Sequence, residues 1–435
     1  MAGSPLSVKK NNDPMSKQKI AVIGAGVAGL TAAWKLQHSA DVTVYEKNDY
    51  IGGHTRTLLI PDGPDKGTPV DTGFIVMNHR NYPHFTDLLK EWQVYLDDSD
   101  MSFSYHEQDS GYAYAGTTLA GVFPTLKRWL DPKHWKLLKE LRRFGEAGSA
   151  ALDDHSLYKQ TLGEFLDHNN FSDIFRDRYL YAMGAAIWSS PPESLAEFPA
   201  EPYLHFFANH GLLTLKNRPQ WRVISGGSHS YVKKALSKLH AEVHTGETPE
   251  KVFRTSEGVD LCFSDGRKES YDHVVIGAHA DEALELLGDP DEQEKRLLGA
   301  WTYHPNEVVL HHWEGVMPEH KACWASWNFA REEGYSAADP VSVSYWMNRL
   351  QNLKTERNYF VTLNRKGSIP EKYIIDRTVL HHPQYNQKAL ETQPDLHDRN
   401  GTRNTWLVGS YFGYGFHEDA VCSAVESTRR LRAAL

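Results

Sequence analysis

The chain has 435 residues, more than a single hydrophobic core supports, so we expect two domains. Apolar residues make up 40% and charged residues 24% of it, a balance typical of folded globular proteins. The formal net charge of -9 argues against nucleic acid as a partner, because phosphate contacts require an excess of lysine and arginine.

The chain begins with a polar stretch, followed by a pattern typical of a βαβ unit. Residues 1–18 are expected to form a disordered leader. A buried parallel strand is predicted over 19–23, an alanine-rich helix up to about His38, and a second strand over 41–46. The apolar run 20–36 contains three glycines and a lysine and falls short of the about 20 residues that a membrane span needs, so we reject a transmembrane helix.

The turn between the first strand and the helix carries a glycine pattern typical of dinucleotide binding. Gly24 permits the tight turn, Gly26 lets the backbone approach a pyrophosphate, and Gly29 lets the helix pack on the strand. Glu46 ends the second strand, where a carboxylate accepts hydrogen bonds from ribose hydroxyls and disfavours NADP. A glycine-rich turn without a ligand, with Glu46 a solvated strand end, is the alternative.

The rest of the chain alternates between two kinds of sequence. Residues 82–218 are rich in tryptophan, leucine and lysine, which predicts the helices of a second domain, and another helix is predicted after Gly227. Later strands are predicted at 242–244, 251–253, 259–263, 273–276, 308–310, 359–363 and 405–409. Those at 308–310 and 359–363 indicate a sheet in the second domain, and the others return to the nucleotide domain.

Several strings resemble the flavin-containing amine oxidase and phytoene desaturase superfamily. They are 46–57, 70–74, 224–227, 272–278 and the strand, loop and helix at the C-terminal end. The resemblance implies an α/β fold, with a Rossmann-like FAD-binding domain and a discontinuous α+β substrate domain. The expected FAD-binding segments are 19–80, 219–290 and 400–435, and the expected substrate segments are 81–218 and 291–399.

The same resemblance implies which residues contact FAD. Besides the three glycines and Glu46, they are Lys47, Gly52, Gly53, His54, Thr55, Arg56, Gly73, Val252, Gly409, Glu418, Asp419, Ala420 and Val421. The start of the last helix is expected at the flavin pyrimidine, where a helix N-terminus stabilises negative charge. Alternatively, Glu418 and Asp419 merely favour the helix dipole. His417 is the candidate catalytic acid or base, although a histidine at a helix start also serves structural roles.

The sequence departs from the family pattern in three ways. The strand expected to carry the amine oxidase lysine reads His304-Pro305-Asn306-Glu307, without a lysine. No cysteine lies between Cys323 and Cys422, so the covalent flavin anchor of some relatives is missing and FAD is expected to bind noncovalently. His54 stands where many relatives have arginine, with Arg56 near enough to compensate.

Cysteine usage also bears on the cellular compartment. Cys262, Cys323 and Cys422 are too few and too widely spaced for a disulfide framework or a zinc site, so no metal is expected. A reducing, cytoplasmic location is therefore favoured.

Three longer strings resemble a narrower group, bacterial flavoproteins encoded beside cyclopropane-fatty-acid synthases, some of them implicated in furan-fatty-acid formation. These strings are 324–329, 345–351 and 413–419. The resulting hypothesis is an FAD-dependent oxidoreductase acting on an apolar substrate, such as an unsaturated or modified fatty-acyl lipid. A flavin amine oxidase, a flavin-dependent fatty-acid isomerase and a noncatalytic partner of a lipid methyltransferase are the alternatives.

A basic segment suggests how a lipid substrate is reached. Residues 126–144 contain seven lysines and arginines and two acidic residues, interleaved with tryptophan and leucine. A basic amphipathic helix of this kind can lie on an anionic membrane, here the inner face, although a helix packed on its own domain gives the same pattern. The oligomeric state is left open.

Overall fold

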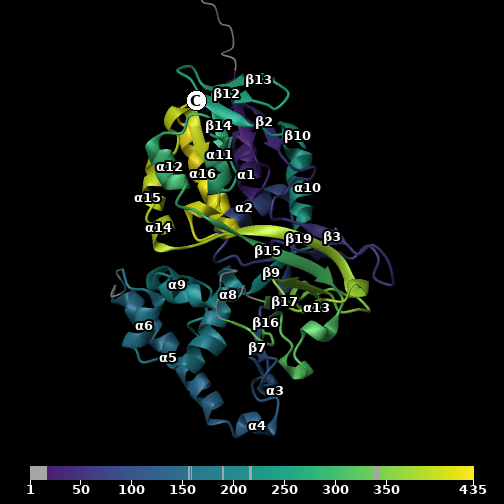
Figure 1. The fold of residues 1–435 in the computed structure, drawn as a ribbon. Helices are drawn as coiled ribbons and strands as arrows, with labels where there is room; N and C mark the ends of the chain where they lie inside the picture. Colours follow the sequence, from purple (N-terminus) through teal and green to yellow (C-terminus); the bar gives the residue numbers. More distant parts are fainter. Residues whose placement is uncertain (1–16, 155–156, 158, 189–190, 215–217, 337–341) are drawn as a thin grey trace, which may run out of the picture.

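The structure, a computed structural model, describes residues 17–154, 157, 159–188, 191–214, 218–336 and 342–435. Nearly all of the leader expected at 1–18 therefore lies outside the described residues. Figure 1 shows two lobes, one built around a parallel sheet and the other around a second sheet with helices beside it, joined where the long strands β15 and β19 cross the molecule.

The first lobe contains a five-stranded parallel sheet in the order β10-β2-β1-β14-β20. Its strands are β1 (Lys19–Ile23), β2 (Asp41–Glu46), β10 (Glu242–Thr245), β14 (His273–Ile276) and β20 (Thr405–Leu407). Residues 20–23 of β1 are buried, as expected for a strand covered on both faces. The predicted α/β, Rossmann-like fold is confirmed, with the strands contributed by three separate parts of the chain.

Three helices cover this sheet. They are α1 (Val27–Leu36), α2 (Pro83–Trp92) and α16 (His417–Arg432), and α16 contacts both of the others. Their apolar side chains share one core with β1 and β14. The helix α2 falls within the range expected for the substrate domain, yet its buried Phe85, Leu88 and Trp92 belong to this core. The helix α10 (His229–Lys238) begins just after the predicted glycine pair and also contacts α2.

Small antiparallel sheets flank the parallel one. They pair β11 (Lys251–Arg254), β12 (Val259–Cys262) and β13 (Lys268–Tyr271); β3 (Thr57–Leu59) and β4 (Pro69–Asp71); and β5 (Val76–Met77), β9 (Trp221–Ile224) and β6 (Leu96–Ser99). The helices α11 (Ala280–Leu286) and α12 (Glu292–Leu298) follow β14, and α15 (Gln393–Arg399) lies beside α12.

The second lobe contains a seven-stranded mixed sheet in the order β19-β15-β18-β17-β16-β7-β8. Its strands are β7 (Phe103–Glu107), β8 (Tyr112–Ala115), β15 (Tyr303–His311), β16 (Trp327–Arg331), β17 (Ser342–Trp346), β18 (Phe360–Leu363) and β19 (Ile374–Pro383). The predicted pairing of strands near Val308 and Val361 is confirmed, since β15 and β18 are antiparallel neighbours.

The prediction of helices throughout 82–218 is wrong for part of that range. Strands β6, β7 and β8 occupy residues between 96 and 115. The turn from Gln108 to Gly111 separates two runs in which aromatic residues alternate, which is a hairpin pattern that the helical interpretation overlooked. The parallel partner of β7 is β16, which is remote in sequence, so no local pattern predicts that pairing.

Helices complete the second lobe. They are α3 (Leu119–Val122), α4 (Leu126–Trp129), α5 (Pro132–Asp153), α6 (Leu162–His168), α7 (Asp173–Phe175), the π-helix η1 (Arg176–Leu180), α8 (Tyr181–Trp188) and α9 (Ala200–Asn209). Shorter helices lie elsewhere in this lobe or between the lobes, at α13 (Met347–Leu350) and α14 (Gln387–Leu390). Among the described helices, none combines the length and the hydropathy required to cross a bilayer.

The prediction of a single basic helix over 126–144 is wrong, because the structure contains two helices there, α4 and α5. Pro132 has no N–H to donate into a continuing helix but fits the first turn of a new one. The carboxylate of Asp131 caps that new helix, accepting a hydrogen bond of 2.9 Å from the Lys133 N–H. The consequence is a bend at Leu130 and Asp131.

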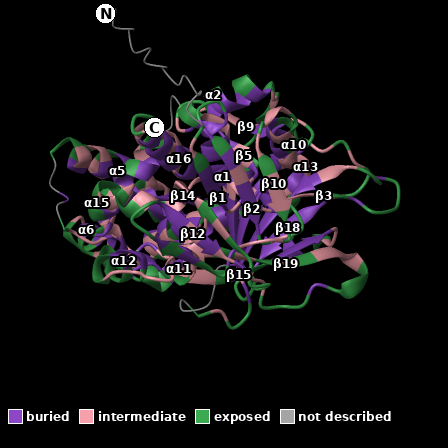
Figure 2. Cartoon of the chain, turned by 90° about the horizontal axis from the view of Figure 1, so that it is seen from above, coloured by how far each residue is buried: buried purple, intermediate pink, exposed green. Residues whose placement is uncertain are grey.

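Figure 2 shows where the buried residues lie when the molecule is turned. They concentrate on the strands of both sheets, while exposed residues mark the outer helices and loops. One apolar cluster covers the parallel sheet beneath α1, α2 and α16, and a larger one extends from that sheet through the second lobe. The two lobes are therefore joined by a shared apolar core.

Candidate functional site

The glycine turn after β1 forms a cradle suited to a phosphate. Gly24 has φ of 92°, and a Cβ there would lie 2.7 Å from the Gly277 carbonyl oxygen. A Cβ on Gly29 would lie 1.8 Å from the Gly24 carbonyl oxygen, so both glycines are required by the protein's own packing. A Cβ on Gly26 would meet only the Cα of Gly53, at 3.9 Å, which leaves space at the position where a pyrophosphate is expected.

The helix that follows is prepared for an anion. Gly26 is the N-cap of α1, no side chain caps the helix, and its first turn contains no acidic residue. Backbone N–H groups and the helix dipole at such an end stabilise negative charge. The residues present therefore fit the diphosphate of FAD.

Glu46 lies beside this turn, as the sequence predicts. One carboxylate oxygen accepts a hydrogen bond of 2.8 Å from the Ala25 N–H, and the other accepts from the N–H and side-chain amide of Asn48. The side chain is buried. A charged acceptor at this position is suited to ribose hydroxyls.

Val252 lies in β11, where its carbonyl accepts a hydrogen bond from the Gly288 N–H and its side chain is fully buried. Its expected contact with FAD stays a prediction. The segment that reaches Glu46 contains Gly246 and Glu247, whose N–H groups donate to the carbonyls of Asn48 and Glu46. The Gly-Glu-Thr-Pro sequence after β10 could have predicted a turn at this position.

A second glycine loop closes over the first. Gly52 pairs with Gly26 in an isolated bridge, and the Gly52 N–H donates to the Ala25 carbonyl at 3.0 Å. Gly53 therefore lies at the pyrophosphate cradle. Gly73 packs so closely on this loop that a Cβ would lie 1.9 Å from the His54 carbonyl oxygen.

His54 faces a cluster of histidines from the substrate sheet and from the loop after β14. Its Nε2 lies 3.0 Å from the His381 carbonyl oxygen, and its ring centroid lies 5.7 Å from that of His279 and 5.5 Å from that of His382. Burial lowers the pKa of all three imidazoles, to about 4 for His279 and about 3 for His382. Neutral rings thus occupy the place where relatives carry a guanidinium.

The two other basic residues expected at FAD are engaged elsewhere. Arg56 forms an ion pair with Asp376 of β19 at 2.8 Å and also donates to Thr72. Lys47 pairs with Glu282 of α11 at 2.5 Å. Arg56 therefore links the two lobes, and the expected compensation for the missing arginine stays a prediction.

The N-terminus of α16 lies near the glycine loops, but its two acidic side chains bind backbone N–H groups of the protein itself. Glu418 accepts hydrogen bonds from the N–H groups of His84 and Phe85 at 2.8 and 2.9 Å, and so caps α2. Asp419 accepts from the Tyr414 and Phe416 N–H groups. Ala420 and Val421 are buried in the core. The backbone of the first turn is thus the part of α16 that remains suited to a flavin contact.

One group of potential metal ligands includes Glu418. Atoms of His84, Glu418 and Cys422 lie within 4.8 Å of one another. Because Glu418 already accepts two backbone hydrogen bonds and one from the Cys422 thiol, we assign no metal to this group. Gly409, at the end of β20, donates its N–H to Ser423 of α16 at 2.9 Å and thereby fixes the helix against the sheet.

His417 lies among aromatic residues of the FAD-binding lobe. Its ring stacks on Phe74 with centroids 3.8 Å apart, and its Nε2 lies 2.9 Å from the Tyr231 hydroxyl. That hydroxyl also contacts Thr55 at 2.7 Å, so a hydrogen-bonded chain joins the second glycine loop to α16. Burial lowers the pKa of His417 to about 3. These contacts favour a positioning role over acid–base catalysis.

The residue before His417 contacts the other lobe. Phe416 stacks on Phe206 of α9 with centroids 4.8 Å apart, and Trp188 of α8 lies 6.4 Å away. Tyr385, which follows β19, lies against Gly415, where a Cβ would be 2.7 Å from its hydroxyl. Phe416 lies in the segment 413–419 that resembles the narrower group of flavoproteins. Its role could not be predicted from sequence, because its partners are far away in the chain.

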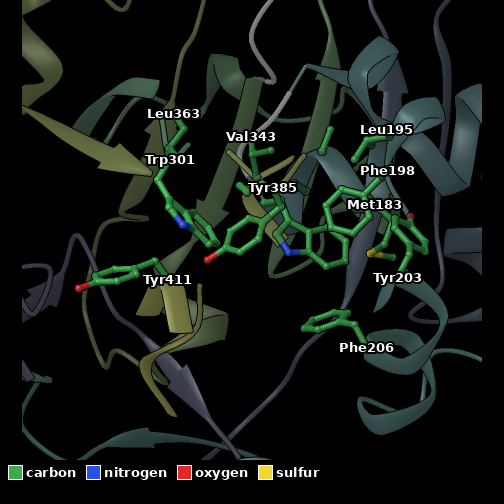
Figure 3. Close-up of a cluster of buried hydrophobic side chains, with 14 of the residues drawn as sticks. Met183, Leu195, Phe198, Tyr203, Phe206, Trp301, Val343, Leu363, Tyr385 and Tyr411 are labelled. Carbon is green, nitrogen blue, oxygen red and sulfur yellow. The ribbon is translucent and has the colours of Figure 1, made fainter. Parts of the chain in front are cut away.

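An apolar cluster surrounds this junction. Figure 3 shows Trp301, Tyr385 and Tyr411 on one side and Met183, Phe198, Tyr203 and Phe206 on the other, with Val343 and Leu363 from the substrate sheet. The ring of Trp301 lies 5.5 Å from Tyr385 and 6.0 Å from Tyr411. Side chains from both lobes thus converge near the N-terminus of α16.

This arrangement defines an FAD-binding oxidoreductase fold: a dinucleotide cradle in one lobe faces apolar side chains from a second lobe. The family model for flavin containing amine oxidoreductases matches residues 27–417, and the chain belongs to this family. The cofactor is FAD, which agrees with the prediction made from the glycine pattern and the strings after it.

Two curated relatives match a large part of the chain. Beta-cyclopiazonate dehydrogenase of Aspergillus flavus is 26% identical over 306 residues, which cover 68% of this chain and 63% of the relative. The 4,4'-diaponeurosporene oxygenase of Staphylococcus haemolyticus is 23% identical over 312 residues, which cover 63% of this chain and 54% of the relative. The matched region therefore spans less than two thirds of either relative.

Solved structures share the fold over nearly the whole chain. A CLA-producing fatty acid isomerase from P. acnes has a TM-score of 0.69 and 16% identity, covering 95% of this chain and 98% of that one. Cyclohexylamine oxidase from Brevibacterium oxydans has a TM-score of 0.69 and 14% identity, covering 96% and 99%. At these identities, the similarity establishes the fold alone.

Proposed function

We propose that this protein is an FAD-dependent oxidoreductase that removes hydride from, or desaturates, an apolar substrate such as an unsaturated or modified fatty-acyl lipid. The observation that carries the proposal is the contact of Phe416 with aromatic residues of α8 and α9, at the start of the helix expected beside the flavin. Apolar side chains beside the expected flavin position favour an apolar substrate.

The strand β15 supports the same substrate class. It has no lysine, and at the place expected for one it presents His304, whose pairing partner on β19 is His382. Asn306 contacts the His382 ring at 2.8 Å. This strand therefore lacks the lysine that amine oxidases of the family use, and a chemistry other than simple amine oxidation is favoured.

Each part of the chain has a distinct task in this proposal. When bound, FAD supplies the two-electron acceptor for hydride removal. Gly24, Gly26 and Gly29 hold the diphosphate, Glu46 holds the ribose, and the first turn of α16 stabilises negative charge at the pyrimidine edge. Phe416 and Tyr385 exclude water from the reacting carbon. The acceptor of the accompanying proton is unassigned, because His417 is enclosed by other aromatic residues.

The reaction class is tested by anaerobic mixing of the flavin-loaded protein with single substrates while flavin absorption is followed. We expect bleaching with an unsaturated or branched fatty-acyl lipid, because a neighbouring double bond delocalises the positive charge that develops as hydride leaves. No bleaching is expected with monoamines or polyamines. Rapid bleaching by an amine, with none by any lipid, would make the protein an amine oxidase.

A flavin-dependent fatty-acid isomerase is the second candidate; the P. acnes isomerase shows that the shared fold accommodates such a reaction. Such an enzyme forms product without net consumption of an oxidant. Product formation with no oxygen or acceptor consumed would therefore support isomerisation over oxidation.

The location belongs to the same proposal. The few, widely spaced cysteines favour the reducing cytoplasm as the location. Because acyl chains of this class reside in membranes, we also propose reversible contact with the inner face of a membrane. The surface that makes this contact is inferred below.

A further inference from the structure

The end of the second lobe carries an unusual surface, here called the tip and defined as residues 116–139. It comprises α3, α4 and the start of α5, and in Figure 1 α3 and α4 lie at the end of the molecule opposite the parallel sheet. Its exposed large apolar side chains are Leu119 (66% exposed), Leu126 (75%), Trp129 (42%), Leu130 (75%) and Trp135 (47%). Monomeric proteins rarely expose such a concentration without a partner.

The aromatic side chains of the tip are held in place by contacts with one another. Phe123 stacks on Trp129 with centroids 4.1 Å apart and lies 5.0 Å from Trp135. The Trp135 indole N–H donates to the Trp129 carbonyl at 2.8 Å. The bend after Trp129 leaves Leu126 and Leu130 exposed beside this aromatic group. The aromatic part of the surface is thus fixed before any partner binds, and its binding costs little side-chain entropy.

The exposed charge of the tip is entirely positive. Lys127, Lys133, Lys136 and Lys139 are exposed. The acidic residue within the tip, Asp131, is paired with Arg128 at 2.5 Å and caps α5. The next acidic residue, Glu140, is buried and bonded to Ser172. Lys133 also lines a cavity with Asp109, Asp173 and Asp177 of the same lobe, so the excess of positive charge rests on Lys127, Lys136 and Lys139. In a chain that carries -9, this local excess of lysine favours an anionic partner.

We propose that the tip docks on the surface of an anionic lipid bilayer. Leucine and tryptophan side chains enter the interface between headgroups and acyl chains, while lysines contact the headgroups. A second copy of the chain fits less well, because a symmetric contact would bring the same lysines together. The inference rests on the membrane contact included in the proposed function, to which it assigns a surface, but it does not depend on the proposed redox reaction.

The test measures binding of the flavin-loaded full chain to vesicles. One set contains phosphatidylcholine alone, and the other contains equal parts of phosphatidylcholine and phosphatidylglycerol. Sedimentation gives the bound fraction. Because the chain has 12 tryptophans, the fluorescence shift is assigned to the tip by its loss in Trp129→Phe with Trp135→Phe. We expect binding to the anionic vesicles, a blue shift on binding, and loss of binding as salt rises.

Two variants separate the apolar and charged contributions. Leu126→Ser with Leu130→Ser is expected to weaken binding roughly tenfold or more, because two exposed apolar side chains no longer enter the bilayer. Lys136→Gln with Lys139→Gln is expected to weaken it roughly thirtyfold. The matched controls are Leu59→Ser, an exposed leucine of β3, and Lys233→Gln with Lys234→Gln, exposed lysines of α10.

The outcomes are decisive in either direction. Weakened binding in both tip variants, with both controls unchanged and flavin content retained, supports the proposal. Equal binding to neutral vesicles, equal effects in tip and control variants, or a tip variant that alters only the oligomeric state would overturn it. Flavin bleaching with a detergent-dispersed lipid reports on the reaction separately, so failure of the reaction and failure of docking are distinguishable.

Discussion

The Glu46 carboxylate accepts hydrogen bonds from Ala25 and Asn48 in a buried position beside the glycine turn. We expect Glu46→Ala to weaken FAD binding, since a charged acceptor is worth about 1.5–3 kcal/mol, or roughly 10- to 150-fold in the dissociation constant. Reconstitution of FAD-free protein, followed by flavin fluorescence, measures this. Lys47→Ala removes an exposed ion pair with Glu282 and is expected to change the affinity less.

The contacts of His417 allow its two possible roles to be separated. His417→Phe keeps the stack on Phe74 and loses the bond to the Tyr231 hydroxyl, and Tyr231→Phe loses the same bond from the other side. A neutral hydrogen bond is worth about 0.5–1.5 kcal/mol, so we expect both variants to slow flavin bleaching by about tenfold at most. A loss of roughly a hundredfold or more in His417→Phe alone would restore His417 as the catalytic base.

At the scale of elements, Glu418 joins two helices that are distant in sequence. Its carboxylate caps α2 from the first turn of α16. We expect Glu418→Ala to lower the free energy of unfolding by about 1.5–3 kcal/mol, because two N–H groups lose a charged acceptor. Urea denaturation measures it. Glu418→Gln keeps one acceptor oxygen, so its free energy of unfolding should lie between those of the unchanged protein and Glu418→Ala. An unchanged urea midpoint in Glu418→Ala would show that water replaces the cap.

The sequence predicted best those elements that are determined by neighbouring residues, such as an apolar pattern next to a turn. The strand from Asp41 to Glu46 has the predicted bounds, because its apolar pattern and the glycine turn before it reinforce each other. The helix over 126–144 was predicted as one, although Pro132 already marked a new start. Phe416 and its aromatic partners could not be joined from sequence, since they meet only through packing of the two lobes. The FAD contact of Val252 rests on resemblance alone and stays a prediction.

For the whole molecule, buried histidines set the response to acid. Burial lowers the pKa of His311 to about 3 and those of His106 and His210 to about 4. Below pH 6.5 the unfolded chain therefore binds protons that the folded chain excludes, and the free energy of unfolding falls as pH falls. Burial also lowers the pKa of His279, His382 and His417 to between about 3 and about 4, which adds to this trend. Burial raises the pKa of Asp71 and Asp419 to about 6, which opposes the trend, but the six histidines outnumber these two aspartates.

One substitution isolates the histidine contribution. His311→Gln removes one titrating group, so the slope of the free energy of unfolding against pH should decrease by about 1.4 kcal/mol per pH unit between pH 6 and 4. Thermal or urea unfolding across that range measures it. The exposed His320→Gln is the control. A parallel shift of the whole curve, without a change of slope, would contradict the assignment of a neutral His311.

The FAD-binding lobe draws its parallel sheet from the beginning, middle and end of the chain, and its last helix, α16, packs on its first, α1. The phosphate cradle is translated early, whereas the turn expected at the pyrimidine edge is translated only with residues 417–420. Pairing between such remote segments is slow. A nascent chain on the ribosome consequently holds only part of the cofactor site until residues 417–420 have been added and α16 has packed on α1.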